Sequence, residues 1–375
     1  MLGIISLLLY NDGRATDIRK LTQQIPQLLS MAIWLAIFTA IIIGFVVHIS
    51  LGYLPLALCF VLAAIITPTD SLALDAVTEN ITMPKNVEAS LKSESLFNDA
   101  SGIVIFNLAL GAFATGNFSF AKGLLSFIVN FFGGILLGVI LGWCSVKIRT
   151  WLVNKSMDTS AVIVPFSVIT PIAVYIVAEE LGTSGIIAAV SAGIVSGINQ
   201  SRLKLTSTNV QLVTAATWMT ITNLLNGFVF VLLGVTLPTV IKNIISKAHK
   251  GVVAMIGFAF IIYAATWIIR FLWTKFNFVQ VNGRNQKSTA KDAFLVATGG
   301  IHGTITLSMA LSIPLTIASK SFPFRDELIF ISAVVILMSL IVPTIVLPFI
   351  LTKKQEGSQE TIDEQRSQMV DFAIQ

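Results

Sequence analysis

Charged residues are scarce in this chain of 375 residues, and their scarcity excludes an ordinary soluble domain. Only 11% of the residues are Asp, Glu, Lys or Arg, whereas 55% are hydrophobic, and the mean hydropathy is +0.86. A soluble protein of this length needs far more polar surface. Runs of about 20 apolar residues recur along the chain, and each is long enough to cross a bilayer core. The sequence therefore predicts a polytopic helical membrane protein.

Cysteine and histidine are also rare, with two and three copies. Cys59 and Cys144 lie inside apolar segments without CxxC spacing, so the sequence predicts neither a disulfide framework nor a zinc site. The HExxH, GxSxG and GxxxxGK patterns are absent, and we expect neither an enzyme nor a bound cofactor. The formal charge of +5 comes from Lys and Arg in loops, without interleaved aromatics, and this pattern argues against nucleic-acid binding.

Ten apolar blocks are separated by charged segments, which indicates an all-α bundle of about ten full spans plus a partial one at Met1 to Tyr10. The blocks cover residues 27–48, 52–70, 87–113, 121–146, 159–180, 184–200, 210–239, 251–275, 291–316 and 327–352. Basic residues gather in alternate loops, so the positive-inside rule places the C-terminus in the cytoplasm. We expect a membrane domain over 1–352 in the cell membrane, and a solvated, disordered tail over 353–375. The short tail and compact loops suggest a bacterial origin.

The most informative segment is Ser93 to Gly102, which runs directly into the apolar Ile103 to Phe106. At 100° per residue, Glu94, Ser95, Asn98 and Asp99 share one side of a helix. Hydrogen bonding between helices would explain Asn98 well, but an ionisable Asp99 at membrane depth calls for a proton or a cation as its partner. The segment therefore favours an ion or proton path.

A second polar feature, Thr67 to Ser71, follows the apolar run that ends at Ile66. Pro68 removes a backbone donor and disfavours helix at Thr67, so the helix is expected to break there. Two interpretations are open. The break could expose carbonyl groups to a cation beside Asp70, as in many transporters, or Asp70 could simply cap the next helix.

Two further segments carry polar residues at membrane depth. Gly299 to Thr304 contains three glycines that weaken the helix and allow close backbone approach, and it includes His302. A lone His is commonly a core residue whose hydrogen bonds are satisfied. His302 is therefore a site candidate only because the other polar segments accompany it. Asn11 and Asp12 end the short N-terminal segment, where Asp12 could be either a turn residue or a site residue.

These residues together resemble a known family. Thr-Asp on one helix, Glu-Ser-Leu-Phe-Asn-Asp on the next, and a Gly-Gly-x-x-Gly segment before the last helix are similar to the CPA1-type monovalent cation:proton antiporters, the NhaP-like sodium/proton exchangers. The resemblance covers residues 5–352. It implies an NhaA/NhaP-like inverted repeat with two crossed, interrupted helices, a homodimer in the full-length form, and alternating access. Relative to the family, the chain is expected to lack the first two helices and part of the third.

The resemblance also assigns roles to the quoted positions. Asp99 is similar to the essential aspartate that binds a cation or a proton, with Na⁺, K⁺ or Li⁺ as the cation. Thr69 would offer its backbone carbonyl, Asp70 a direct or water-mediated contact, and Ser95 a hydroxyl. Asn98 occupies the position that is Asn in the electroneutral exchangers. One carboxylate that holds either a proton or a monovalent cation agrees with one-for-one exchange.

Two departures from the family pattern lead to specific expectations. Glu94 matches a structural glutamate whose usual arginine partner is replaced by His302. Because imidazole titrates near neutrality, we expect a Glu94–His302 contact that depends on pH. At Asn11 many relatives carry a glutamate, and Asp12 would partly replace its charge.

Three alternatives stay open from the sequence. A passive cation channel would also place Asp and Thr in a pore, although it should show a filter or charged rings. Another kind of ion transporter would share the same polar residues. A truncated antiporter that lacks essential helices would be inactive.

Overall fold

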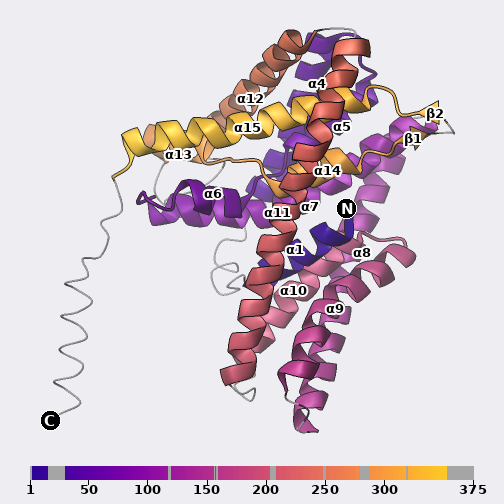
Figure 1. Cartoon of the computed structure of the whole chain (residues 1–375), viewed down its shortest axis with the longest axis vertical. Helices are drawn as coiled ribbons and strands as arrows, with labels where there is room; N and C mark the ends of the chain where they lie inside the picture. Colours follow the sequence, from indigo (N-terminus) through magenta and orange to yellow (C-terminus); the bar gives the residue numbers. More distant parts are fainter. Residues whose placement is uncertain are drawn as a thin grey trace.

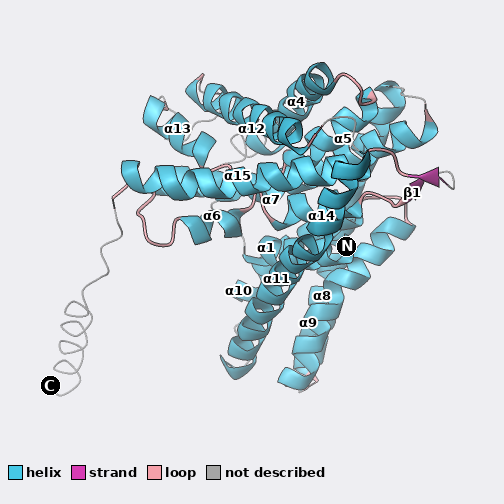
Figure 2. Cartoon of the chain, turned by 45° about the horizontal axis from the view of Figure 1, so that its top comes forward, coloured by secondary structure: helices cyan, strands magenta, loops and turns pink. Residues whose placement is uncertain are grey.

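The computed structural model describes residues 2–15, 30–116, 120–155, 157, 159–202, 208–247, 251–276, 278, 288–317 and 320–352. Helices account for nearly all of this part of the chain (Figures 1 and 2). They are α1 (Leu2–Ala15), the π-helix η1 (Ser30–Leu35), α4 (Ala36–Leu51), α5 (Leu56–Ile66), α6 (Ser71–Val77), α7 (Lys85–Thr115), α8 (Phe120–Asn154), α9 (Ser160–Glu180), α10 (Gly185–Arg202), α11 (Thr208–Lys247), α12 (Val252–Lys275), α13 (Ala290–Thr298), α14 (Thr304–Ser312) and α15 (Arg325–Ile350). A short antiparallel hairpin pairs β1 (Thr316–Ile317) with β2 (Lys320–Ser321).

The predicted all-α membrane bundle is confirmed. Each predicted apolar block falls on one helix or on one broken helix. Among the described residues, five helices are long and apolar enough to cross a membrane, or six if the bent pair α5–α6 is one span. The count of ten full spans and the inverted repeat therefore stay predictions. The tail over 353–375 lies outside the described residues.

The N-terminal segment differs from the expected turn. Helix α1 continues through Asn11 and Asp12 to Ala15, so Asp12 is a helical residue. The interpretation of Asp12 as a turn residue is wrong. The reason is packing, because α1 lies along α10, where Gly193 and Gly197 let the α1 backbone approach closely at Tyr10 and Arg14.

The helices form two groups, which meet along α11, where α7 packs against α8, and where α1 contacts α7 and α14 (Figures 1 and 2). The core group comprises η1, α4, α5, α6, α7, α12, α13, α14 and α15. The scaffold group comprises α1, α8, α9, α10 and α11. Helix α11 packs against α9 in its own group and against α14 and α15 of the core group.

Two helices of the core group are interrupted where the sequence predicted weak points. The first break separates α5 from α6 at Thr67–Asp70, with a bend of 51° between the two halves. Pro68 lies in this gap and cannot donate a backbone hydrogen bond. The second break separates α13 from α14 at Gly299–Gly303. The two breaks meet, because the Asp70 amide donates to the Ile301 carbonyl at 2.7 Å.

Candidate functional site

Asp99 lies midway along α7 and is 1% exposed. Its Oδ1 atom has no hydrogen-bond donor among the described residues. The charged groups that act on it electrostatically are the carboxylates of Asp70, Asp12 and Glu94. A buried carboxylate among other acids is costly unless a proton or a cation neutralises it. These surroundings therefore favour a state in which a proton or a cation neutralises Asp99.

Two neighbours of Asp99 on α7 bind the first break rather than Asp99. Ser95 donates its hydroxyl to the Thr69 carbonyl at 2.8 Å and accepts from the Ser71 amide at 3.1 Å. Asn98 donates to Thr69 Oγ1 at 2.9 Å and accepts from the Thr69 amide at 3.4 Å. The structure thus brings Thr69, Ser95 and Asn98 together, as the sequence analysis expected. These hydrogen bonds fix the unwound segment against the helix that carries Asp99.

Asp70 joins both breaks. Its Oδ1 accepts from the Leu72 and Ala73 amides at 2.9 and 3.1 Å and so caps α6. Its Oδ2 accepts from the amide and the hydroxyl of Thr304 at 2.9 and 3.1 Å. The negative charge thereby lies at the N-termini of α6 and α14, where helix dipoles favour it. The capping interpretation of Asp70 is confirmed, and its electrostatic effect on Asp99 comes in addition.

The expected contact between Glu94 and His302 is wrong. His302 donates from Nδ1 to the Pro68 carbonyl at 2.7 Å, and its amide donates to Ser339 Oγ at 3.0 Å. A carbonyl can only accept, so this hydrogen bond places a proton on Nδ1. His302 therefore links the two breaks instead of pairing with a carboxylate.

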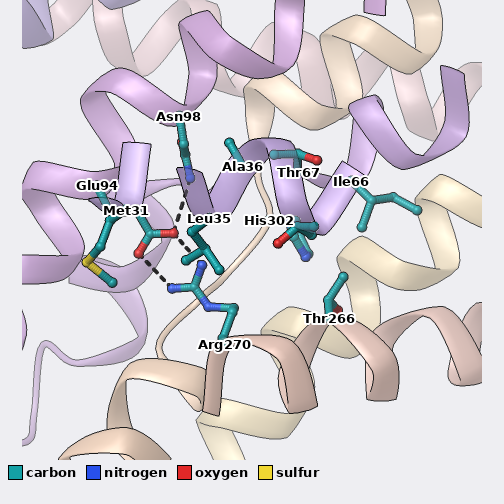
Figure 3. Close-up of a pocket in the computed structure, with 11 residues that line it drawn as sticks. Met31, Leu35, Ala36, Ile66, Thr67, Glu94, Asn98, Thr266, Arg270 and His302 are labelled. Carbon is teal, nitrogen blue, oxygen red and sulfur yellow. Dashed lines mark hydrogen bonds and ion pairs between the residues drawn. The ribbon is translucent and has the colours of Figure 1, made fainter. Parts of the chain in front are cut away.

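Arg270 on α12 takes the place that was expected for His302. Its guanidinium forms a bidentate ion pair with Glu94, with Nη2 to Oε2 at 2.8 Å and a second, shorter contact from Nη1 to Oε1. Dashed lines in Figure 3 join Glu94 to Arg270 and Asn98 and leave His302 apart. Both partners are buried, at 6% and 1% exposure. A charged residue this deep in an apolar segment is the signal that could have identified Arg270 from the sequence.

A small cavity of about 10 Å³ lies between this ion pair and His302 (Figure 3). Polar groups of Glu94, Asn98, Arg270 and His302 line it together with apolar side chains. A volume of this size holds about one water molecule. One water molecule there would lie between polar groups of α7, α12 and the second break.

Close backbone approach explains the glycines of the second break. A Cβ atom at Gly303 would overlap the Asp70 carboxylate, and one at Gly300 would overlap the Arg270 guanidinium. The two glycines are thus required by the two charged groups that they contact.

Asn11 and Asp12 have different surroundings. Asp12 acts electrostatically on Asp99. Asn11 instead donates to Thr222 Oγ1 on α11 at 3.2 Å. It lines a cavity of about 480 Å³ with Arg14 of α1, Leu72 of α6 and residues of α11. We call this cavity the vestibule. Of the two candidate residues, Asp12 is the one associated with Asp99.

Both the sequence and the fold of this chain have counterparts among known proteins. The sequence profile described as "Sodium/hydrogen exchanger, transmembrane" matches residues 2–353. The chain belongs to this family. Within the family, it is 36% identical over 352 residues to a sodium, potassium, lithium and rubidium/H⁺ antiporter of Bacillus subtilis, covering 92% of this chain and 52% of the relative. The chain spans about half the length of the curated relatives it matches in Bacillus.

Two further comparisons agree with the family. A Na⁺/H⁺ antiporter of Halobacillus dabanensis is 28% identical over 307 residues, with coverage of 80% of this chain and 69% of the relative. The solved structure of the sodium proton antiporter MjNhaP1 from Methanocaldococcus jannaschii at pH 8 aligns with a TM-score of 0.70. It shares 20% sequence identity, and the alignment covers 91% of this chain and 81% of that one. This likeness shows that the two chains share a fold.

Proposed function

We propose that the protein is a secondary active antiporter that exchanges one monovalent cation for one proton. The observation that carries the proposal is the buried Asp99, which lies beside two crossed helix breaks and three other acidic residues. One carboxylate cannot hold a proton and a cation together, so competition for Asp99 couples the two gradients. The exchange is electroneutral because the neighbouring Asn98 carries no second charge.

The other site residues position the ion and its ligands. Thr69 and Ser95 supply oxygen atoms beside Asp99, while Asp70 and Asp12 add negative charge that attracts a cation. The carbonyl of Pro68 is already bonded to His302 and to Thr306. Glu94 and Arg270 keep α7 and α12 in register but do not themselves bind the transported ion.

Contacts at the two ends of the bundle support alternating access. The vestibule is lined by the last turn of α1 and the first half of α11, on the side that the basic loops place in the cytoplasm. At the opposite ends of α11 and α15, Asn243 Nδ2 donates to Asp326 Oδ2 at 2.8 Å. We therefore propose that this conformation is the one that opens toward the cytoplasm.

The relatives guide the choice of cation. The Bacillus subtilis relative is named for sodium, potassium, lithium and rubidium, and the Halobacillus dabanensis relative for sodium. We propose Na⁺ as the cation, with K⁺ and Li⁺ as further candidates. We also propose a homodimer in the cell membrane with a cytoplasmic C-terminus, and no enzymatic activity.

Proteoliposomes test this function. A Na⁺ or K⁺ gradient should drive proton movement, reported by an internal pH dye, and the signal should persist when the membrane potential is clamped. Asp99→Asn should abolish it because an amide cannot exchange a proton for a cation. Asp75→Asn, on the exposed face of α6, is the matched control and should keep the parent rate. Cation flux without proton movement from a folded parent would indicate a channel, and no flux at all would indicate an inactive chain; either result would contradict the proposal.

A further inference from the structure

The C-terminal end of α8 carries an exposed row of alternating aromatic and basic residues. Trp143, Lys147 and Trp151 on the helix, and Lys155 directly after it, follow one another at intervals of four residues, and all four are exposed. Residues spaced by four lie on the same side of a helix. The Lys147 ammonium lies 4.4 Å from the centre of the Trp143 ring, as a cation over an aromatic face. We call these four residues the Trp-Lys stripe.

The opposite side of α8 is used for packing. A Cβ atom added at Gly138 would lie 2.3 Å from the Ala188 carbonyl oxygen of α10, so the two backbones are in close contact there. At about 100° per residue, Gly138 and Lys147 lie on opposite sides of the helix. The exposed side continues toward the N-terminus with the apolar residues Leu136 and Ile140. The stripe therefore ends a face that points away from the rest of the chain.

The length of α8 places the stripe at a membrane surface. The apolar span covers Ile128–Asn154, whereas about 20 helical residues cross the hydrocarbon core. A helix that enters the core near Ile128 therefore leaves it near Lys147, and Trp and Lys are typical of this boundary. Ser145 of α8 and Arg14 of α1 line one small cavity, so the stripe lies at the same end of the molecule as the vestibule.

The charge at this surface is positive. The sequence contains no Asp or Glu between Asp99 and Asp158, and Asp158 lies outside the described residues. Among the described residues, no ion pair involves Lys147 or Lys155. An ammonium group has three N–H donors, and the contact with the Trp143 ring does not require a hydrogen-bond acceptor. Both lysines can therefore donate to an anion outside the protein.

We propose that the Trp-Lys stripe binds the headgroup of an anionic phospholipid in the adjoining leaflet. The two ammonium groups contact the lipid phosphate, and the two indole rings pack against the glycerol and the upper acyl chain. Anionic headgroups attract basic residues that lie beside a membrane-spanning helix. A second copy of the chain, related by a two-fold axis at this face, would bring two identical basic stripes together, and like charges repel. Charge complementarity therefore favours a lipid, and the proposal does not depend on the transport function.

Native mass spectrometry of the full chain tests the binding. With phosphatidylglycerol and phosphatidylcholine added in equal amounts, the parent should retain phosphatidylglycerol in preference. Lys147→Gln and Lys155→Gln should each weaken this retention about fivefold, and the double variant should weaken it further. Lys242→Gln removes an exposed lysine at the end of α11 away from the vestibule and should bind as the parent does. Equal retention of the two lipids by the parent, or unchanged retention by the double variant, would overturn the proposal.

Brominated lipids test the location of the site. Phosphatidylglycerol with dibrominated acyl chains should quench the Trp fluorescence of the parent more strongly than dibrominated phosphatidylcholine. Trp143→Phe combined with Trp151→Phe should remove this difference, and a difference that persists would place the lipid elsewhere and overturn the proposal. Cys144, which is exposed beside Trp143, reports a second copy at the same face. Efficient cross-linking of two chains through Cys144 by a mild oxidant would identify the occupant as a second copy instead of a lipid.

Discussion

Two buried carboxylates of α7, those of Glu94 and Asp99, have different partners. Glu94 receives a permanent, bidentate counter-charge from Arg270, whereas Asp99 has an oxygen atom without a donor among the described residues. A bidentate guanidinium contact holds the Glu94 carboxylate in one geometry between α7 and α12. The two carboxylates can therefore have different roles. The Glu94 carboxylate is engaged by Arg270, whereas Oδ1 of Asp99 has no such donor, as the exchange proposed for Asp99 requires.

The ion pair yields a stability prediction at this scale. Arg270→Gln leaves the Glu94 carboxylate buried without its partner, and the free energy of unfolding should fall by about 3 to 5 kcal/mol. Adding Glu94→Gln to this variant should recover part of the loss, because the uncompensated charge is removed. Unfolding in detergent, followed by denaturant titration, measures both changes.

An exposed ion pair provides the control. Lys92 contacts Asp75 and Glu88 at 2.8 and 2.9 Å, but its side chain is 41% exposed. Lys92→Gln should cost no more than about 1 kcal/mol. Equal losses for Lys92→Gln and Arg270→Gln would show that burial of the Glu94–Arg270 pair has no special role.

Pairs of half-helices, rather than intact helices, set the geometry of the site. The break at Pro68 and the break at Gly299–Gly303 are held together by Asp70, His302 and Thr306. The Asp70 carboxylate accepts from Thr304, and the His302 imidazole donates to the Pro68 carbonyl, so each break has a side chain bonded to the other pair of half-helices. A change in either break should therefore disturb both.

Gly303→Ala tests this dependence. The added methyl group would overlap the Asp70 carboxylate, so we expect a loss of about 1 to 3 kcal/mol in stability and a strong loss of exchange. Gly257→Ala places the same methyl group in open space on α12 and should be neutral or stabilising by up to about 1 kcal/mol. Thermal unfolding and proteoliposome flux measure the two effects. Full exchange by Gly303→Ala would refute the tight crossing.

Much of this architecture could be predicted from the sequence, because local signals marked it. The length of the apolar runs predicted the membrane-spanning helices. Pro68 predicted the first helix break, and Gly299, Gly300 and Gly303 predicted the second. The partner of Glu94 could not be found in this way, since Arg270 lies 176 positions away in the chain. Nor does a sequence show that α1 continues past Asp12, because that depends on packing against α10.

Across the whole molecule, the core group and the scaffold group must change their relative positions if Asp99 is to face both sides. The hydrogen bond from Asn243 on α11 to Asp326 on α15 joins the two groups at the end of α11 away from the vestibule. Opening toward the outside should break this contact, while the interior of each group stays packed.

A cross-link tests this movement. Asn243→Cys combined with Asp326→Cys, in a chain with Cys59→Ala and Cys144→Ala, should lose exchange when a short bifunctional thiol reagent joins the two new cysteines. With a bis-methanethiosulfonate reagent, which joins the two cysteines through disulfides, reduction should cleave the link and restore the flux. Either single-cysteine chain, treated in the same way, should keep its flux. Exchange at the full rate in the cross-linked protein would exclude relative motion at this end.

The most direct test of the account is the dependence of the KM for Na⁺ on pH. If cation and proton compete for the single carboxylate of Asp99, KM should fall about tenfold for each unit of rising pH while Asp99 is protonated, and then level off. Raising the pH removes the competing proton, which fixes the direction of the change. A KM that does not vary with pH, or one that falls about a hundredfold per unit, would contradict one-for-one competition at Asp99.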